Sequence, residues 1–299
     1  MSERYKAIEM CRGEFDVRRM CAVLGVKRSG YYAWRRRGPS DRSNADTALK
    51  PVIEAAFQQG RGCYGVPRVH AELQAHDYRV GRKRVARLMR QMGLSVQRPK
   101  RWLPTTTQVN AAHPIQPNTL ARDFTATAPN QKWVTDITYI PTREGWLYVA
   151  GIVDLFARQV VGLSMESRMR TDLVVRAWHM AQQQRRPNAG LLHHSDRGSQ
   201  YTSQRYQADL AQQRVQVSMS RTGECWDNAP NEVTKGMESF WATLKRECAT
   251  TMFETRSQAQ AAIFEYVMVF YNRTRRHSRL GYLSPAAFEA QFQRQLLCS

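Results

Sequence analysis

The residues best suited to do chemistry are aspartates that interrupt or end apolar segments. Asp136 lies inside "QKWVTDITYI", an alternating strand-like stretch in which a carboxylate has to be paired, metal-bound or turned toward a cleft. Asp196 ends the apolar segment "GLLHHSD", and Asp154 ends the strand-like segment "GIVD". Each of them taken alone is more often structural, because aspartates at strand ends commonly cap the next turn. His193 and His194 lack further metal-ligand spacing, and we expect them to be buried or turn residues.

Three glutamates follow in the segment "CWDNAPNEVTKGMESFWATLKRE", and any of them could add a carboxylate to a phosphoryl-transfer site. They are Glu232, Glu238 and Glu247. From Met237 onward, apolar residues recur at helical spacing, which predicts a helix with one buried side. The residues of that side are Phe240, Leu244 and Cys248. Glu238 shares the opposite face with Lys245, whereas we expect Glu247 at a solvent-facing helix end.

The elements that must position these residues alternate between strand and helix patterns. Three strands joined by short connections predict an antiparallel meander at 131–140, 145–156 and 158–165. Further elements are a helix at 171–186, a strand at 190–196, a helix at 202–214 and a strand at 215–220. This order predicts an α/β layer with a mixed sheet.

The first third of the chain carries most of the positive charge. Residues 1–110 hold 23 Lys or Arg against 9 Asp or Glu, a net charge of +14 out of +20 for the whole chain. Two helix-turn-helix patterns lie there, one with Asp16 as N-cap and Gly25 as helix breaker, the other over 47–94. A single Lys/Arg run is usually a solvated face. Two such units in tandem on so basic a segment favour DNA binding.

The chain is expected to divide into four parts. They are a helix-turn-helix segment, a second helix-turn-helix-like DNA-binding domain, a basic proline-containing linker, and an α/β core with C-terminal helices. Their ranges are 1–40, 45–97, 98–122 and 123–290.

Composition restricts the partners and the compartment. The 299 residues carry a net charge of +20 and have a pI near 10.2, which indicates a polyanionic partner such as nucleic acid. No apolar run approaches the ~20 residues of a spanning helix, and the first residues lack the apolar core of a secretion signal. Six cysteines and seven histidines form no metal-ligand set. We therefore expect a reduced, cytoplasmic, DNA-associated protein with no membrane partner.

Several longer blocks together resemble one family. In chain order they are "QKWVTDITYI", "GWLYVAGIVDLFARQVVG", "LLHHSDRGSQYTS", "SMSRTGECWDNAP", "ESFWATLKRE" and "YNRTRRHSRLGYLSP". They resemble the signature blocks of bacterial insertion-sequence transposases, namely the second-reading-frame product of the insertion-sequence-three family. The catalytic core of that family is similar to retroviral integrases. Upstream, "SGYYAWRRR" and "GCYGVPRVHAEL" resemble its helix-turn-helix segments.

The resemblance implies a ribonuclease-H-like integrase core with a mixed sheet, preceded by helix-turn-helix segments. It also implies an Asp, Asp, Glu set that binds two Mg²⁺ ions, or Mn²⁺, with Asp136 and Asp196 matching the first two ligands. Two such ions can activate the attacking oxygen and stabilise the leaving oxygen of a phosphodiester, and hard cations prefer carboxylates. The implied activity is that of a DDE transposase. It binds the ends of an insertion sequence, cleaves to free 3′ hydroxyls and transfers strands.

The third ligand has two candidates. The family's usual spacing from Asp196 leads to Glu232, but the family's usual continuation follows Glu238, as if the six residues "NEVTKG" were inserted. Helix geometry favours Glu238, because it shares a helix face with Lys245, whereas Glu232 precedes the helix-weakening Gly236.

The family also implies DNA contacts and an assembly. The basic residues expected to contact DNA are Arg35, Arg36, Arg37, Arg82, Lys83, Arg84, Arg87, Lys245, Arg275 and Arg276. The expected DNA partners are the terminal repeats of the element and the target. Joining two ends implies a homo-oligomer on DNA, and the family's active enzyme is often a fusion with the product of an upstream reading frame.

Overall fold

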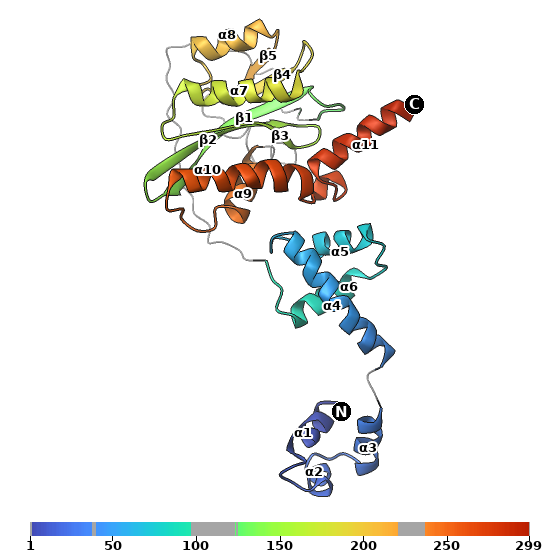
Figure 1. Ribbon diagram of the computed structural model, residues 1–299. Helices are drawn as coiled ribbons and strands as arrows, with labels where there is room; N and C mark the ends of the chain where they lie inside the picture. Colours follow the sequence, from blue (N-terminus) through green and yellow to red (C-terminus); the bar gives the residue numbers. More distant parts are fainter. Residues whose placement is uncertain (1, 38–39, 97–122, 124, 221–236, 299) are drawn as a thin grey trace. The chain divides into compact units, whose positions relative to one another are not determined.

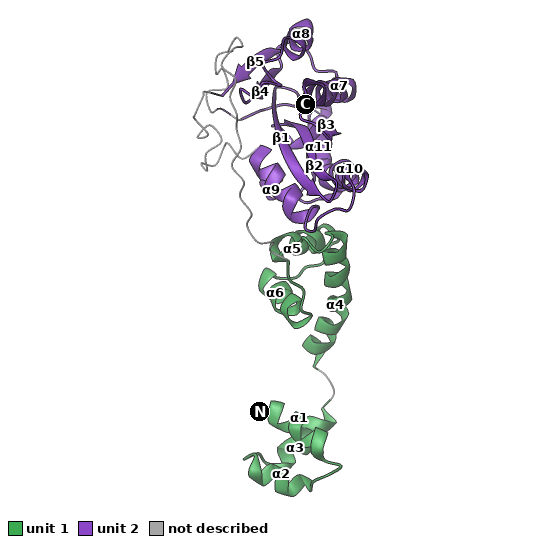
Figure 2. Cartoon of the chain, turned by 90° about the vertical axis from the view of Figure 1, so that its left-hand side faces the viewer, with its two compact units in different colours: residues 1–96 green, residues 97–299 purple. Residues whose placement is uncertain are grey.

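The computed structural model describes residues 2–37, 40–96, 123, 125–220 and 237–298. It forms two compact units, residues 1–96 and 97–299 (Figure 2). The expected linker at 98–122, the alternative ligand Glu232 and the "NEVTKG" insertion lie outside the described residues.

Three helices begin the first unit, α1 (Ser2–Cys11), α2 (Val17–Val23) and α3 (Arg28–Arg36). The predicted cap is confirmed, since Asp16 accepts a hydrogen bond from the backbone N–H of Arg18 and starts α2. Gly25 adopts a left-handed conformation with φ of 61° and so separates α2 from α3. A small core joins the three helices around Ile8, Cys21 and Tyr31.

Three more helices follow, α4 (Asp41–Gln59), α5 (Val66–Ala75) and α6 (Arg82–Gln91). Their apolar faces meet in a common core. Its buried members include Ile53, Phe57, Val69, Leu73, Val85, Leu88 and Met89. The basic residues of α6 point away from that core, and Arg82 and Lys83 are exposed.

The second unit is built on a five-stranded mixed sheet. Its strands are β1 (Lys132–Thr142), β2 (Gly145–Asp154), β3 (Gln159–Glu166), β4 (Leu192–Ser195) and β5 (Gln216–Met219). The strand order is β3-β2-β1-β4-β5, in which β1 to β3 form the predicted antiparallel meander. Strand β4 runs parallel to both β1 and β5. The mixed sheet expected from the order of elements is therefore confirmed.

Helices cover both faces of this sheet (Figure 1). On one side lie α7 (Thr171–Arg185) and α8 (Gln204–Gln212), and on the other α9 (Met237–Glu247) and α10 (Arg256–Glu265). The π-helix η2 (Tyr266–Thr274), the 3₁₀ turn η3 (Ser278–Leu280) and α11 (Pro285–Cys298) complete the unit. With helices on both faces, neighbours on β1 such as Trp133 and Val134 are both buried.

The main core lies between the sheet and α7 and α8. It includes Trp133, Ile152, Val161, Leu173, Trp178, Leu210 and Met219. Helix α7 packs very closely at Gly162 of β3, where a Cβ atom would stand 2.3 Å from the carbonyl oxygen of Ala177. Trp133 and Ile137 of β1 pack in this core, whereas Asp136, on the opposite face of the strand, contacts α9. None of the described helices is long and apolar enough to span a bilayer.

Candidate active site

Asp136 occupies the middle of β1, opposite Gly151 of β2. Its Oδ1 accepts a hydrogen bond from the backbone N–H of Ile137 at 2.8 Å, and its Oδ2 accepts one from Trp241 Nε1 at 3.0 Å. Burial raises the pKa of Asp136 to about 7, and the charge of Asp196 adds to that shift. The two hydrogen bonds thus hold the carboxylate in place, while burial disfavours its charged form. Shifted pKa values of this kind are common at functional sites.

Asp196 directly follows β4, the strand that pairs in parallel with β1. The last residues paired between the two strands are Val134 of β1 and His194 of β4. Asp136 and Asp196 each follow their paired residue by two positions. The two side chains therefore reach the same level of adjacent strands on the same face. Asp196 Oδ1 accepts a hydrogen bond from the backbone N–H of Gly198 at 2.9 Å, and burial raises its pKa.

Glu238 approaches the aspartates from α9. It lies in the first turn of that helix with an exposed side chain, and its negative charge contributes to the raised pKa of Asp136. Lys245 lies on the same helix face, with Nζ 5.3 Å from the centroid of the Tyr139 ring. Burial lowers the pKa of Lys245, and the charge of Asp136 opposes that shift. The three carboxylates and this lysine therefore belong to one electrostatic cluster.

The donors of this cluster suit a hard divalent cation. They are carboxylate oxygens, whose mutual repulsion a cation would relieve. Within the described part of the chain, however, no three His, Cys, Asp or Glu side chains already converge as a ligand set. The two aspartates are fixed by the strands, whereas Glu238 is exposed and has three side-chain torsions with which to turn toward them.

Comparison with known proteins agrees with this arrangement. Residues 126–225 and 238–292 match two families described as integrase core domains, and residues 44–102 match a family described as an HTH-like domain. The chain is 47% identical to the insertion element IS600 uncharacterized 31 kDa protein of Shigella sonnei, over 91% of this chain and 98% of that protein. It is 41% identical to transposase InsF for insertion sequence IS3A of Escherichia coli K12, over 96% of this chain and 98% of that protein.

The chain belongs to the IS3 family of transposases. The family resemblance seen in the sequence is thereby confirmed, as is the fold class, a ribonuclease-H-like integrase core preceded by helix-turn-helix segments. An integrase core in a transposase implies polynucleotidyl transferase activity, and the HTH-like domain implies DNA binding.

Similar solved structures include the catalytic core domains of two viral integrases. That of HTLV-2 has 15% identity and a TM-score of 0.38, and covers 55% of this chain and 99% of that one. That of BIV has 15% identity and a TM-score of 0.40, and covers 56% of this chain and 99% of that one.

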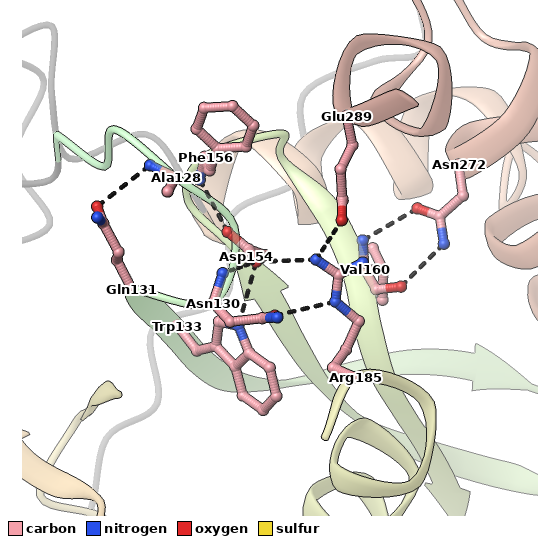
Figure 3. A network of polar contacts seen from close by, with 10 residues as sticks. All are labelled: Ala128, Asn130, Gln131, Trp133, Asp154, Phe156, Val160, Arg185, Asn272 and Glu289. Carbon is pink, nitrogen blue, oxygen red and sulfur yellow. Dashed lines mark hydrogen bonds and ion pairs between the residues drawn. The ribbon is translucent and has the colours of Figure 1, made fainter. Parts of the chain in front are cut away.

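Asp154, the third aspartate candidate, has a structural role in the transposase (Figure 3). Its Oδ2 accepts hydrogen bonds from Asn130 N at 2.7 Å and Trp133 Nε1 at 3.3 Å, and its Oδ1 accepts one from Phe156 N at 2.9 Å. Arg185 lies 3.4 Å from the same carboxylate. These donors satisfy Asp154 in the interior, away from Asp136 and Asp196.

The two histidines before Asp196 are interior residues, as expected. His193 Nε2 is 2.7 Å from the hydroxyl of Tyr206, and His194 Nδ1 is 3.0 Å from Ser218 Oγ. Both side chains are buried, and burial lowers the pKa of His193 to about 3. A neutral, hydrogen-bonded imidazole in this position stabilises β4 and its neighbours.

Glu247 was expected at a solvent-facing helix end and Arg275 in contact with DNA, but the two side chains form a buried ion pair. Arg275 Nε and Nη2 each donate to a Glu247 carboxylate oxygen at 2.6 Å, and the Tyr266 hydroxyl donates to the same group at 2.8 Å. Both charged side chains are only 3% exposed. Glu247 is therefore not solvent-facing, and Arg275 is not on a DNA-contacting surface. The reason is that η2 folds back against α9 and encloses the pair, which local sequence does not reveal.

Replacing one partner of this pair should destabilise the transposase strongly. Glu247→Gln removes the charge that balances the buried Arg275 guanidinium, so we expect a loss of about 3–5 kcal/mol in the free energy of unfolding, measured by urea denaturation. Arg246→Gln is a matched control, because that guanidinium is 46% exposed and 3.8 Å from Glu247. It should cost less than about 1 kcal/mol. Similar losses for both variants would contradict a structural role for the Glu247–Arg275 pair.

The other basic residues expected to contact DNA differ in their interactions within the protein. Arg84 and Arg87 of α6 bind Asp46 of α4 at 2.7 and 2.6 Å, a partner that the sequence did not reveal. Hydrogen bonds from Arg87 and Arg84 lower the pKa of Asp46. Arg35 lies 3.6 Å from Glu9, and Arg276 donates to the carbonyl oxygen of Tyr282 at 3.0 Å. The exposed members of this set are Arg35, Arg36, Arg37, Arg82 and Lys83.

Three residues around Asp136 were not anticipated. Trp241 donates to its carboxylate, and Gly151 lies opposite it on β2. Tyr201, fully buried, is hydrogen-bonded to Thr135, and the pKa of its hydroxyl is raised by burial and then by the charges of the two aspartates. A glycine in mid-strand often marks the close approach of another group. Gly151 is the signal that could have revealed this packing.

Proposed function

We propose that this IS3-family transposase cleaves the ends of its insertion sequence to free 3′ hydroxyls and transfers those strands to another DNA. In this proposal Asp136, Asp196 and Glu238 hold two divalent ions, Mg²⁺ or Mn²⁺. The observation that carries it is the placement of Asp136 and Asp196 at one level of adjacent parallel strands. Burial, and then the charge of Asp196, raises the pKa of Asp136 to about 7.

Each residue has a defined task. Two bound cations would activate the attacking oxygen and stabilise the leaving oxygen of a phosphodiester. Asp136 and Asp196 supply rigid carboxylates from the strands, and Glu238 turns inward from α9 to complete the set. Lys245 lies on the same face of α9 and holds the DNA phosphate near these carboxylates, for which a compact ammonium ion is well suited.

The basic helical segments of the first unit bind the DNA. The exposed Arg36, Arg37, Arg82 and Lys83 contact phosphates of the terminal repeats, whereas Arg84 and Arg87 exchange their bonds to Asp46 for DNA. We also propose the domain ranges 1–40, 45–97, 98–122 and 123–290 for this division of labour.

Two ends have to be joined in one reaction, so the active form is an oligomer on DNA. In this proposal it also includes the product of an upstream reading frame. The protein works in the bacterial cytoplasm on nucleoid DNA, where its substrate lies.

Removing divalent metal tests the proposal directly. In EDTA, the full-length protein should still retard duplexes that carry the ends of its own element, because the affinity comes from basic side chains. It should release no 3′ end and form no joined product until Mg²⁺ is added, as denaturing gels would show. Cleavage in EDTA would contradict the metal-dependent mechanism. Binding without cleavage in Mg²⁺ or Mn²⁺ would indicate a DNA-binding regulator instead of an enzyme.

A further inference from the structure

Trp241 lies directly over the strand pair that carries Asp136. In the antiparallel register of β1 and β2, Asp136 is opposite Gly151. A Cβ atom on Gly151 would come within 2.8 Å of Trp241 Cη2 and 3.1 Å of Cζ2. Carbon atoms do not normally approach so closely. Glycine at position 151 therefore creates the space that the indole ring fills.

The indole uses its single polar atom to reach Asp136. Trp241 Nε1 donates to Oδ2 at 3.0 Å, while the backbone N–H of Ile137 donates to Oδ1 at 2.8 Å. Each carboxylate oxygen receives one donor and keeps a further lone pair for a cation. An indole N–H can only donate, so it favours the ionised carboxylate that a cation requires. The two donors together hold the carboxylate plane in one orientation.

Trp241 also connects Asp136 to the helix that carries Glu238. Glu238, Trp241 and Lys245 stand at i, i+3 and i+7 of α9 and share one helix face. The Trp241 side chain is buried, and Lys245 approaches the Tyr139 ring of β1 on the same side. Rotation of α9 about its axis would break the bond from Trp241 to Asp136. The rotation of the helix, and with it the direction of Glu238, is therefore tied to the position of Asp136.

We infer that Trp241 is a positioning residue for the cation site, in that its indole N–H orients the Asp136 carboxylate and, through α9, the approach of Glu238. The inference rests on the proposed function, in which these carboxylates hold the ions. Trp241 acts through Asp136 and not on the reacting atoms. Hydrogen bonds to metal-binding side chains commonly change metal affinity by about 10–100-fold.

Trp241→Phe tests the inference, because it keeps an aromatic ring over Gly151 and removes the donor. We expect the Mn²⁺ affinity of the full-length protein, measured by isothermal titration calorimetry, to fall about tenfold or more. The Mg²⁺ concentration for half-maximal cleavage should rise by a similar factor, with the rate recovered at higher Mg²⁺. Equal Mn²⁺ affinity in Trp241→Phe and the wild type would overturn the inference. If that variant does not fold, Gly151→Ala displaces the indole and should weaken Mn²⁺ binding in the same way.

Two tryptophans of the same unit provide matched controls. Trp133 donates to Asp154 at 3.3 Å, and Trp178 Nε1 has no hydrogen-bond partner among the described residues. Both side chains are fully buried. Trp133→Phe and Trp178→Phe should lower the melting temperature and leave the Mn²⁺ affinity unchanged. If they weaken Mn²⁺ binding as much as Trp241→Phe does, loss of packing explains the effect and the inference fails.

Asp136→Ala separates this inference from the function on which it rests. If the wild type binds Mn²⁺ and Asp136→Ala does not, the cation site stands and Trp241→Phe alone decides the role of the indole. If Asp136→Ala binds Mn²⁺ as the wild type does, or the wild type binds none, the proposed cation site is wrong. The role of Trp241 then falls with it.

Discussion

Asp136→Ala and Asp196→Ala are each expected to abolish cleavage and strand transfer in Mg²⁺ while leaving binding to the element's ends largely intact. In the proposed function the carboxylates hold the cations, whereas the affinity for DNA comes from the basic first third of the chain. Bound metal contributes several kcal/mol of transition-state stabilisation, which corresponds to about a thousandfold or more in rate. The measurement is the single-turnover rate of 3′-end release on end-labelled duplexes, together with a gel-shift titration.

Asp172→Ala provides a control for these two variants. Asp172 lies in the same unit, but its side chain is 48% exposed and pairs with Arg205 at the protein surface. An exposed ion pair of this kind contributes little to the free energy of folding. Its loss should therefore leave both cleavage and stability nearly unchanged. Full cleavage by either Asp136→Ala or Asp196→Ala would remove that residue from the active site.

Glu238→Gln should lose nearly all cleavage activity, and Glu232→Gln should keep most of it. A neutral amide does not replace an anionic ligand of a hard cation. Glu238 has the position for that role, because it shares a face of α9 with Trp241 and Lys245 and its charge acts on Asp136. Glu232 lies outside the described residues, and we predict it to be dispensable on an inserted loop, where the loss of a carboxylate has little effect.

The two glutamate variants have to be assayed side by side for Mg²⁺-dependent release of 3′ ends. Metal-free melting temperatures should be similar for both variants, since the Glu238 side chain is exposed at the start of α9. An inactive Glu232 variant beside an active Glu238 variant would show that the family's usual spacing from Asp196 holds. The helix argument would then be wrong.

The sequence by itself determined the family and the order and type of the elements between residues 131 and 220. The meander of β1 to β3 follows from three apolar strands with short connections, which pair locally. The cap of α2 at Asp16 and the shared face of Glu238 and Lys245 are properties of a single helix, so spacing alone predicts them. Helix α1 was not anticipated, because Ile8 is its single fully buried side chain among the described residues and the apolar pattern is correspondingly weak.

Only the tertiary structure decided which charged residues lie together in the candidate site. Asp136 and Asp154 both sit in apolar strands and look alike in sequence. Distant donors satisfy Asp154, whereas Asp136 is brought level with Asp196 by the parallel pairing of β4 with β1. Trp241 reaches Asp136 from 105 residues away, and Arg275 reaches Glu247 from 28. Such partners are chosen by strand pairing and by the return of η2 onto α9. These are contacts between elements, and the spacing of residues within one element carries no information about them.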